Sequence, residues 1–411
     1  MRVLHLATTY PLHPGDSNAV FVQAVCEGLA RLGHEIEVLL PWHPDLQLDR
    51  PDSGVKLRAF HYTPTRRWHP WGYAQALSGD RRLRPDAYVA AIPAALTAWR
   101  AIRRLRAKRD YDLLHAHWLI PNAPIVAAAR GTEGPPMVIS CHGSGVFLAE
   151  RFSWVRRLAE YALARSAAVT ACSAELANRV AAMGQGPRPQ RLPYGVDTRR
   201  FAPLDVAQRQ AARRELARRH DLPADAPWLL AVGRLVYKKG FDVLINAMPR
   251  MLATEPQARA LIVGSGPLEG ELREQAERAG VSSRVVLAGP VPHVELPRYF
   301  GAADAVVVPS VHGPSGNVDG LPNTLMEALA SGTPVVASAV AGIPDVVVHG
   351  ENGLLVAEND AAALASALLR LLDDSQLRGA IGARARSNAA AELDWSTIIK
   401  SFEQVYRDAC A

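Results

Sequence analysis

The sequence predicts an α/β protein built from two doubly wound, parallel-sheet domains that face each other across a cleft. In both halves of the chain, short strands that are apolar on both faces alternate with segments of helical periodicity, which is typical of a parallel sheet covered by helices on both sides. The length of 411 residues exceeds what one ordinary core supports. Many of the strands end in glycine or serine, and ligands of such sheets bind at the carboxyl ends of the strands.

The first half opens with a strand at Val3–Ala7, and a helix with an apolar face follows and ends at Gly33. We expect the remaining strands of this half at Ile36–Pro41, Asp112–Trp118, Met137–Gly143 and Ala168–Ser173. The strands expected in the second half are Trp228–Arg234, Arg259–Gly266, Arg284–Gly289, Asp304–Ser310 and Pro334–Ser338. The predicted organisation is therefore a first domain at 1–200, a linker at 201–227, a second domain at 228–390, and a C-terminal helix at 391–411 that packs back on the first domain.

The composition is that of a soluble globular protein, with 49% hydrophobic and 21% charged residues. No apolar run reaches the ~18 residues that a membrane-spanning helix needs, and the N-terminal strand is too short for the apolar core of a signal peptide. We therefore expect a cytoplasmic protein. The four cysteines are far apart, and we interpret them as reduced thiols that neither bind zinc nor form disulfides: Cys26, Cys141, Cys172 and Cys410.

The net charge of +6 is concentrated in the segment 66–109, which holds 11 Lys and Arg residues against Asp80 and Asp86. One basic patch of this kind argues against a general nucleic-acid footprint. Apolar residues at Leu96, Trp99, Ile102 and Leu105 are expected to mark one helix face, with arginines around it, and aromatic residues are interleaved with Arg66 and Arg67 upstream. This pattern fits docking on an anionic membrane, and it fits equally well a helix with one core side and one solvated side.

The stretch Gly313–Ser338 is predicted to form a polar loop, a helix and a strand, in that order. Pro322 suits the first position of the helix, Gly332 suits its end, and Leu325, Met326 and Leu329 keep helical spacing. A loop that leads into a helix N-terminus presents backbone N–H groups and a positive dipole end to an anion such as a phosphate.

Arg234 and Lys239 flank the point where a strand ends in Gly-Arg and a helix begins at Gly240. A guanidinium and an ammonium that converge on a helix N-terminus form a good diphosphate site without a metal, and we favour this interpretation over two solvated surface cations. Gly264 and Gly266 follow the next strand, where they either admit a ligand close to the backbone or simply form a tight strand-to-helix turn.

Glu327 is expected about two turns into the helix of the stretch Gly313–Ser338, with its side chain pointing into the cleft. A carboxylate in this place can accept two ribose hydroxyls, and the alternative is an acid that complements the helix dipole. His142 follows an apolar strand and precedes glycine, so it is predicted to hydrogen-bond a sugar hydroxyl or a leaving oxygen. His115 and His117 are instead expected to be packed or hydrogen-bonded near the core.

Five segments spread over nearly the whole chain occur together: GHEIEVLLP, SCHGS, LPYGVDTRRF, VGRLVYKKG and DGLPNTLMEALASGTPVVAS. Their combination makes the chain resemble a retaining GT-B glycosyltransferase of family 4. The resemblance implies that Arg234 and Lys239 bind the donor diphosphate, and the E-x₇-E motif of the family falls on Asp319 and Glu327.

By the same resemblance, Glu327 binds the ribose, whereas Asp319 and the amides after it face the sugar and phosphates. His142 matches the family's first-domain histidine at the donor sugar, and the turn around Val291 takes the base. The predicted catalytic residues are His142, Asp319, Arg234 and Lys239, and the predicted donor-binding residues are Arg234, Lys239, Gly264, Gly266, Val291, Gly320, Leu321, Asn323 and Glu327.

The sequence departs from the family pattern in two places. Asp319 stands where the family has a glutamate and is one methylene shorter. The N-terminal glycine pair of the family is replaced here by a loop with Gly15, Asn18 and Ala19, in which the Cβ of Ala19 restricts the approach of donor or acceptor.

The predicted reaction moves a hexosyl-type sugar from a nucleotide sugar to a hydroxyl acceptor with retention, without a metal or cofactor, in cell-surface polysaccharide or glycolipid synthesis. The acceptor is expected to be a sugar or a lipid-linked sugar, and the enzyme to lie peripherally at the inner face of the membrane. Other interpretations are a sugar-nucleotide epimerase, a phosphorylase, or a non-catalytic nucleotide-sugar-binding protein. Donor hydrolysis, phosphate dependence, or binding without turnover, respectively, would distinguish them.

Overall fold

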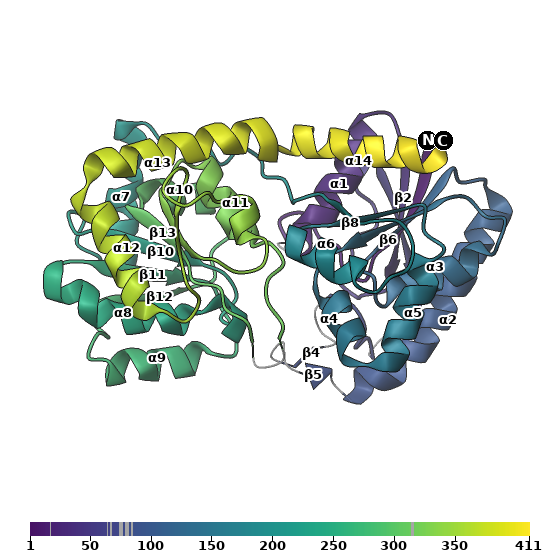
Figure 1. Ribbon diagram of the computed structural model, residues 1–411, viewed down its shortest axis with the longest axis horizontal. Helices are drawn as coiled ribbons and strands as arrows, with labels where there is room; N and C mark the ends of the chain where they lie inside the picture. Colours follow the sequence, from purple (N-terminus) through teal and green to yellow (C-terminus); the bar gives the residue numbers. More distant parts are fainter. Residues whose placement is uncertain are drawn as a thin grey trace. The chain divides into compact units, whose positions relative to one another are not determined.

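The computed structural model describes residues 1–411 apart from 17, 64, 66–67, 74–76, 79–81, 84 and 314–315, and gives the backbone alone for 77–78, 82–83, 85 and 88. The chain forms two compact units (Figure 1). The first unit comprises Met1–Pro193 together with Trp395–Ala411, and the second comprises Tyr194–Asp394.

A seven-stranded sheet with the order β3-β2-β1-β6-β7-β8-β9 organises the first unit, and every pair of neighbours in it is parallel. Its strands are β1 (Arg2–Leu6), β2 (Glu35–Pro41), β3 (Val55–Phe60), β6 (Leu113–His117), β7 (Met137–Cys141), β8 (Ala168–Ala171) and β9 (Gln190–Arg191). The short strands β4 (Leu77–Ser78) and β5 (Arg82–Leu83) pair antiparallel with each other in a separate sheet. The helices of the unit are η1 (Pro51–Ser53), α1 (Val20–Arg31), α2 (Pro85–Lys108), α3 (Asn122–Arg130), α4 (Ser144–Arg151), α5 (Ser153–Leu163), α6 (Ala174–Ala181) and α14 (Trp395–Cys410).

The second unit holds a six-stranded parallel sheet with the order β12-β11-β10-β13-β14-β15. Its strands are β10 (Trp228–Val232), β11 (Arg259–Val263), β12 (Val285–Gly289), β13 (Ala305–Val308), β14 (Val335–Ser338) and β15 (Leu354–Val356). Its helices are η2 (Tyr237–Lys239), η3 (Ile343–Asp345), η4 (Ala389–Leu393), α7 (Val206–His220), α8 (Phe241–Thr254), α9 (Glu269–Arg278), α10 (Leu296–Ala302), α11 (Asn323–Ala330), α12 (Ala361–Asp373) and α13 (Ser375–Asn388).

Each strand predicted from an apolar run is present within a few residues of its expected bounds, so the predicted class of two parallel-sheet domains is confirmed. The strands β3, β9 and β15 were not predicted. The residues 201–227, for which the sequence suggested a linker, lie in the second unit. They are held there because Asp304 accepts from Arg209 and Arg213 of α7 at 2.8 and 3.0 Å.

The C-terminal helix α14 packs against α1 in the first unit, as expected for the last helix of the chain. A Cβ at Gly28 of α1 would lie 2.4 Å from Cγ1 of Ile399, so this glycine allows the two helices to approach closely. Phe402 and Tyr406 of α14 belong to the same hydrophobic core as buried residues of α1 and of the first sheet. Of the cysteines, Cys26, Cys141 and Cys172 are buried and Cys410 is exposed.

Helix α2 does not present the apolar face that the sequence suggested. Ile102 is 1% exposed and faces the core, whereas Leu96 is 49% exposed on the opposite side. Successive steps of three residues drift around a helix that has 3.6 residues per turn, so Leu96 and Ile102 cannot share a narrow face. The exposed apolar stripe of α2 consists instead of Val89, Ile92 and Leu96.

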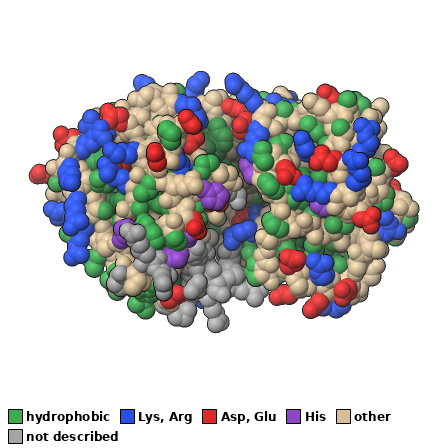
Figure 2. All heavy atoms as spheres, turned by 180° about the vertical axis from the view of Figure 1, so that it is seen from behind, with side chains coloured by type: hydrophobic (Ala, Val, Ile, Leu, Met, Phe, Trp, Pro, Cys, Tyr) green, Lys and Arg blue, Asp and Glu red, His purple; other side chains and the backbone are tan. Residues whose placement is uncertain are grey.

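Arginines extend this stripe toward the C-terminal end of α2, where Arg100, Arg103 and Arg104 are exposed. Figure 2 shows Lys and Arg side chains gathered along one edge of the first unit. The two upstream arginines of the expected patch, Arg66 and Arg67, lie outside the described residues. Among the residues that the structure describes, no helix is both long and apolar enough to cross a bilayer.

Candidate functional site

The strand order of the second unit reverses between β10 and β13, which are neighbours in the sheet. Ligands of open α/β sheets bind at such a switch point, outside the carboxyl ends of the strands. The loop after β10 and the segment after β13 are joined there, because Val311 N–H donates to Lys238 O at 3.0 Å. A Cβ at Gly240, which has φ +64°, would lie 1.8 Å from Pro309 O, so only glycine allows this approach.

The two glycines after β11 pack against the loop that carries Arg234. A Cβ at Gly264 would lie 1.8 Å from Gly233 O, and one at Gly266 would lie 2.4 Å from Leu235 O. Leu235 also donates its N–H to Ser265 O at 2.9 Å. These glycines therefore fix the backbone on both sides of Arg234, and direct ligand contact by either of them stays a prediction.

Arg234 and Lys239 lie in the same loop after β10, as predicted. The Arg234 side chain is exposed. The aliphatic part of Lys239 folds over Gly233, since a Cβ at Gly233 would lie 3.1 Å from Lys239 Cε. The backbone that precedes Arg234 and the stem of Lys239 are thus in contact, which brings both cations to the end of one central strand.

Asp319 pairs with two adjacent lysines of this loop. Its carboxylate oxygens lie 3.0 Å from Lys238 Nζ and 2.5 Å from Lys239 Nζ, and its side chain is only 15% exposed. Burial raises the pKa of the Asp319 carboxyl, but the two ammonium groups outweigh it and hold the pKa well below its ordinary value. Asp319 is therefore an anion that orders both lysines, and Lys238 is a site residue that the sequence reasoning missed.

Helix α11 begins where the polar loop ends, with Pro322 as its N-cap. Leu325, Met326 and Leu329 are at most 1% exposed, as their spacing predicted. Gly332, at φ +66°, adopts the left-handed conformation just after the helix. Pro322 offers no side-chain cap, and Leu325 N–H donates to Pro322 O at 3.1 Å, so Asn323 and Thr324 carry the first-turn N–H groups that no cap side chain accepts.

The loop before α11 is anchored to the backbone of the η3 segment. Gly320 O accepts from Gly342 N–H at 2.8 Å. Leu321 is 4% exposed and packs inside the unit. These contacts fix the direction in which the chain enters α11, and the predicted roles of the Gly320, Leu321 and Asn323 amides stay predictions.

Glu327 is the fifth residue of α11, so it lies little more than one turn into the helix and not two. Its side chain is mostly buried, and Oε1 accepts a hydrogen bond from His293 Nε2 at 2.7 Å. Among the described residues, Oε2 is buried without a hydrogen-bond partner. An unsatisfied buried carboxylate oxygen is costly, so Oε2 of Glu327 is placed to accept a hydrogen bond from a group that the described residues do not supply.

His293 was not predicted, although its position gave a signal. It directly follows the Pro290–Pro292 turn after β12, which also holds Val291, the residue expected at the base. Val291 is half-buried. The His293–Glu327 hydrogen bond ties this turn to α11, and it connects two of the predicted donor-binding segments within one unit.

In the first unit, His142 directly follows β7, as predicted, and its ring packs against two aromatic side chains. The ring centroids of Phe21 and Trp118 lie 4.7 and 5.0 Å from it. Its Nε2 lies 3.2 Å from Nδ1 of His117. Burial, followed by the neighbouring His117, lowers the pKa of His142, so its imidazole is neutral at neutral pH.

The predicted N-terminal loop precedes α1. Asn18 donates from its side chain to Asp16 Oδ1 at 2.9 Å, and Gly15 has φ +90°. Ala19 is the N-cap of α1 and has φ +50°, ψ +38°. This left-handed conformation is uncommon for a residue with a Cβ, so Ala19 occupies a backbone position that favours glycine.

Comparison with known proteins identifies the family. The family model described as "Glycosyl transferases group 1" matches residues 212–388, and the model described as "Glycosyltransferase Family 4" matches residues 19–200. The chain is 33% identical over 302 residues to the GDP-mannose-dependent α-(1-6)-phosphatidylinositol monomannoside mannosyltransferase of Mycobacterium tuberculosis, an alignment that covers 72% of this chain and 76% of that protein. It is also 29% identical to a glycogen synthase of the same organism, over 99% of this chain and 94% of the other.

Solved structures agree on the fold. Sucrose-phosphate synthase from Thermosynechococcus elongatus superposes with a TM-score of 0.78 at 23% identity, covering 99% of this chain and 98% of that one. The Anabaena protein HepE, in complex with UDP, gives a TM-score of 0.76 at 21% identity over 98% and 99% of the two chains. The chain thus has the GT-B fold and belongs to the group 1 glycosyl transferases, which makes it a glycosyltransferase that uses a nucleotide-sugar donor.

Proposed function

We propose that this enzyme transfers a hexosyl-type sugar from a nucleoside-diphosphate sugar to a hydroxyl acceptor with retention at the anomeric carbon, without a metal ion. The observation that carries the proposal is the arrangement at the β10/β13 switch point. Two cations lie in the loop after the central strand, Asp319 in the loop that leads into α11 pairs with one of them, and a buried carboxylate oxygen of Glu327 lacks a partner among the described residues. Together they match a diphosphate and a ribose.

In this proposal Arg234 and Lys239 neutralise the charge that grows on the departing diphosphate, aided by the first-turn amides of α11. Transfer passes through an oxocarbenium-like state. Because protein cations and a helix dipole provide this charge stabilisation, the reaction does not call for a metal. The acceptor hydroxyl attacks from the face that the diphosphate leaves, and a diphosphate oxygen takes its proton.

Glu327 is assigned the ribose hydroxyls, with His293 holding its other oxygen. Asp319 orders Lys238 and Lys239 and releases part of this pairing to the diphosphate when the donor binds. Val291, in the turn that precedes His293, is assigned the base. His142 keeps the role that the resemblance implies, a hydrogen bond to the donor sugar.

We further propose that the acceptor is a lipid-linked sugar and that the first unit docks peripherally on an anionic membrane. Helix α2 presents an apolar stripe that leads into exposed arginines. Helix α5 adds a second apolar stripe, because Trp154 is 64%, Leu158 43% and Tyr161 36% exposed. Helix α3 packs between α2 and α5, so the three helices form one layer on the sheet (Figure 1). The relative that acts on a phosphatidylinositol mannoside supports a glycolipid acceptor.

A thermal-shift screen against a panel of nucleotide sugars tests the donor site, because a ligand that binds the folded state raises the unfolding temperature. The expected result is a rise for one base-and-sugar combination, retained by the corresponding nucleoside diphosphate and lost in Arg234→Ala. Anomeric analysis of the product with that donor then tests retention. Equal, negligible shifts for all donors would contradict the proposal.

A further inference from the structure

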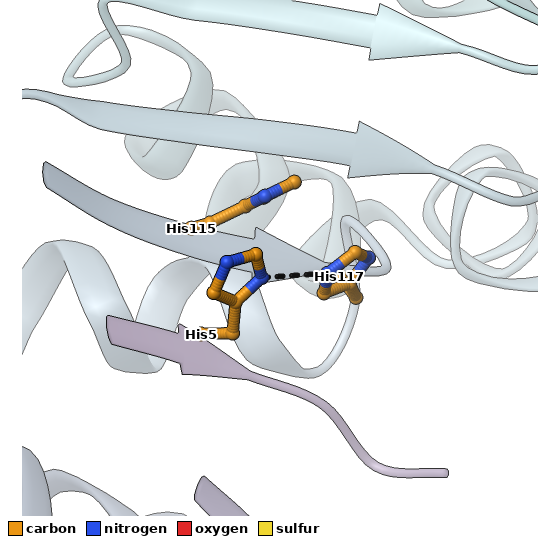
Figure 3. A group of neighbouring side chains, drawn as sticks. All are labelled: His5, His115 and His117. Atoms are coloured by element: carbon orange, nitrogen blue, oxygen red, sulfur yellow. Dashed lines mark hydrogen bonds between the residues drawn. The ribbon is translucent and has the colours of Figure 1, made fainter. Parts of the chain in front are cut away.

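Four histidines of the first unit, three of them buried, form a hydrogen-bonded chain that the proposed reaction does not explain. They come from β1, from β6 and from the residue after β7. Nε2 of His142 lies 3.2 Å from Nδ1 of His117, and Nε2 of His117 lies 3.1 Å from Nδ1 of His5. Figure 3 shows the His5–His117 contact, with His115 beside it.

The chain continues to the C-terminal helix through a phenol. Tyr406 OH of α14 lies 3.4 Å from Nε2 of His5 and 2.5 Å from Nδ1 of His115. Nε2 of His115 then lies 2.8 Å from Ser140 Oγ, which is 2.7 Å from Thr170 Oγ1. A single path of polar atoms therefore runs from His142 to Thr170, and its interior members are at most 2% exposed.

The histidines are better suited to this chain than to a metal. The rings of His115 and His117 are stacked with centroids 4.2 Å apart and planes 27° apart, and those of His5 and His117 are 17° from parallel. The lone pair of an imidazole nitrogen lies in the plane of the ring, so stacked rings direct their lone pairs side by side and not to one point. Moreover, each nitrogen of these three rings already has a protein contact.

All titratable groups that meet in the chain are neutral at neutral pH. Burial lowers the pKa values of His5, His115 and His117, and it raises those of Tyr406 and of Cys26, whose Sγ lies 3.7 Å from His5 Nδ1. A neutral imidazole carries one proton, so a nitrogen that donates obliges the other nitrogen of the same ring to accept. The direction of one hydrogen bond therefore fixes all the others.

The shortest contact sets the direction. A phenol is a stronger acid than a neutral imidazole N–H, so across 2.5 Å the Tyr406 hydroxyl donates to Nδ1 of His115. The Tyr406 oxygen then accepts from Nε2–H of His5, whose Nδ1 accepts from Nε2–H of His117. Nδ1 of His117 accepts in turn from Nε2–H of His142. On the other branch, Nε2–H of His115 donates to Ser140, and the Ser140 hydroxyl donates to Thr170.

We propose that this chain fixes the tautomer of His142, with the proton on Nε2 and Nδ1 as an acceptor, and that Tyr406 on the C-terminal helix is the positioning residue that sets it. Any further partner of the His142 ring nitrogens must then donate to Nδ1. If His142 contacts the donor sugar, which rests on the proposed function, it accepts a sugar hydroxyl and does not donate to one.

Two substitutions, at different points of the chain of histidines, should reverse the direction of its hydrogen bonds. Tyr406→Phe removes the acceptor of His5 Nε2–H, and Ser140→Ala removes the acceptor of His115 Nε2–H. A buried N–H without an acceptor is unfavourable, so the protons shift to the other ring nitrogens along the chain. In both variants the proton of His142 is expected on Nδ1. Tyr62→Phe is the matched control, since this buried hydroxyl of the same unit donates to Trp71 O at 3.1 Å, outside the chain.

The experiment is a proton–nitrogen correlation spectrum of the full-length chain with nitrogen-15-labelled histidine, in which protonated and unprotonated ring nitrogens resonate far apart. The His142 signals are identified by their loss in His142→Gln. The expected result is Nε2–H in the wild type and in Tyr62→Phe, and a gain of Nδ1–H in Tyr406→Phe and in Ser140→Ala.

A wild-type His142 with its proton on Nδ1 would overturn the proposal, and so would a His142 signal that neither substitution changes. Since the spectra need no donor, this test is independent of the proposed function. If the chain behaves as expected but no nucleotide sugar binds, only the proposed function fails. Two variants guard against one of them failing to fold.

Discussion

The carboxylate of Asp319 lies 2.5 Å from the ammonium of Lys239, the lysine assigned to the donor diphosphate. The same carboxylate lies 3.0 Å from Lys238, so one acid pairs with two adjacent cations in the loop after β10 and leaves the three groups with one net positive charge. The aspartate that replaces the family's glutamate is thus short enough to sit between both lysines. In the proposed function, the diphosphate competes with Asp319 for Lys239 when the donor binds.

Asp319→Asn is expected to lower the free energy of unfolding at neutral pH by about 2–4 kcal/mol, because it removes the carboxylate that pairs with two mostly buried ammonium groups. The folded-state pKa of Asp319 lies below the unfolded value of about 3.9. The stabilisation is therefore complete above that value and is lost as the pH falls through it toward the folded-state pKa. Denaturant unfolding at several pH values measures the difference.

The control for this series is Asp373→Asn, an exposed acid of the same unit, which is expected to change stability by less than about 0.5 kcal/mol at every pH. A difference between wild type and Asp319→Asn that persists unchanged at about pH 2 would show that the ion pairs are not its source.

Arg234→Ala is expected to weaken binding of the nucleoside diphosphate by about tenfold or more, since a charge-assisted hydrogen bond contributes about 1.5–3 kcal/mol. Turnover should fall below detection, because in the proposed function the same guanidinium stabilises charge on the leaving group. Calorimetry and a transfer assay measure the two effects. Arg250→Ala, at an exposed arginine on α8, should leave affinity and turnover unchanged. Normal affinity in Arg234→Ala would show that Arg234 does not bind the diphosphate.

Glu327→Gln is expected to weaken nucleoside-diphosphate binding by about tenfold, because Oε2 loses the charge that attracts ribose hydroxyls. The 2′,3′-dideoxy nucleotide should bind the wild type about as weakly as the ordinary nucleotide binds Glu327→Gln. Its affinity should fall little further in the variant. Such non-additivity identifies the direct contact. Equal losses for both nucleotides would place Glu327 in a structural role, and Glu351→Gln, an exposed acid of the same unit, serves as the control.

Sequence reasoning found the parts of the fold that local pattern determines. The central strands are apolar on both faces, so short apolar runs such as Trp228–Val232 can be recognised as strands from the sequence. The strand β3, Val55–Phe60, was missed because charged residues interrupt it, as expected for a strand at the edge of the sheet. The face of α2 was misassigned because spacing alone does not tell which side of a helix the sheet covers.

At the site, the motif located Arg234, Lys239 and Glu327, but not the pairing among charges. The contact of Asp319 with Lys238 joins residues 81 positions apart and depends on the neighbouring strands β10 and β13. The same holds for His293 and Glu327, which meet only because two strand ends lie at one edge of the sheet. The glycines after β11 were found, and the packing that requires them became visible only in the structure.

The membrane-docking prediction concerns the exposed stripe of α2. Ile92→Ser with Leu96→Ser, and separately Arg100→Glu with Arg103→Glu, should each reduce co-sedimentation with vesicles that contain anionic lipid. A basic residue near such a surface contributes about 1 kcal/mol to membrane binding. Reversing the charge of two of them should therefore weaken binding by about tenfold or more. Val348→Ser, an exposed apolar residue of the second unit, is the control. Binding insensitive to anionic lipid would contradict docking through this face.

Ala19→Gly should stabilise the first unit, because Ala19 has φ +50° and an L-residue in this conformation costs about 1–2 kcal/mol. The added flexibility of glycine in the unfolded chain offsets about 0.5–1 kcal/mol of that gain. A net stabilisation of about 0.5–1 kcal/mol is therefore expected in denaturant unfolding. The same substitution at Ala24, inside α1, should instead destabilise by about 1 kcal/mol. Both variants replace an alanine by glycine, and the two positions differ in backbone conformation. A change in unfolding free energy of the same sign in both variants would show that Ala19 is not strained.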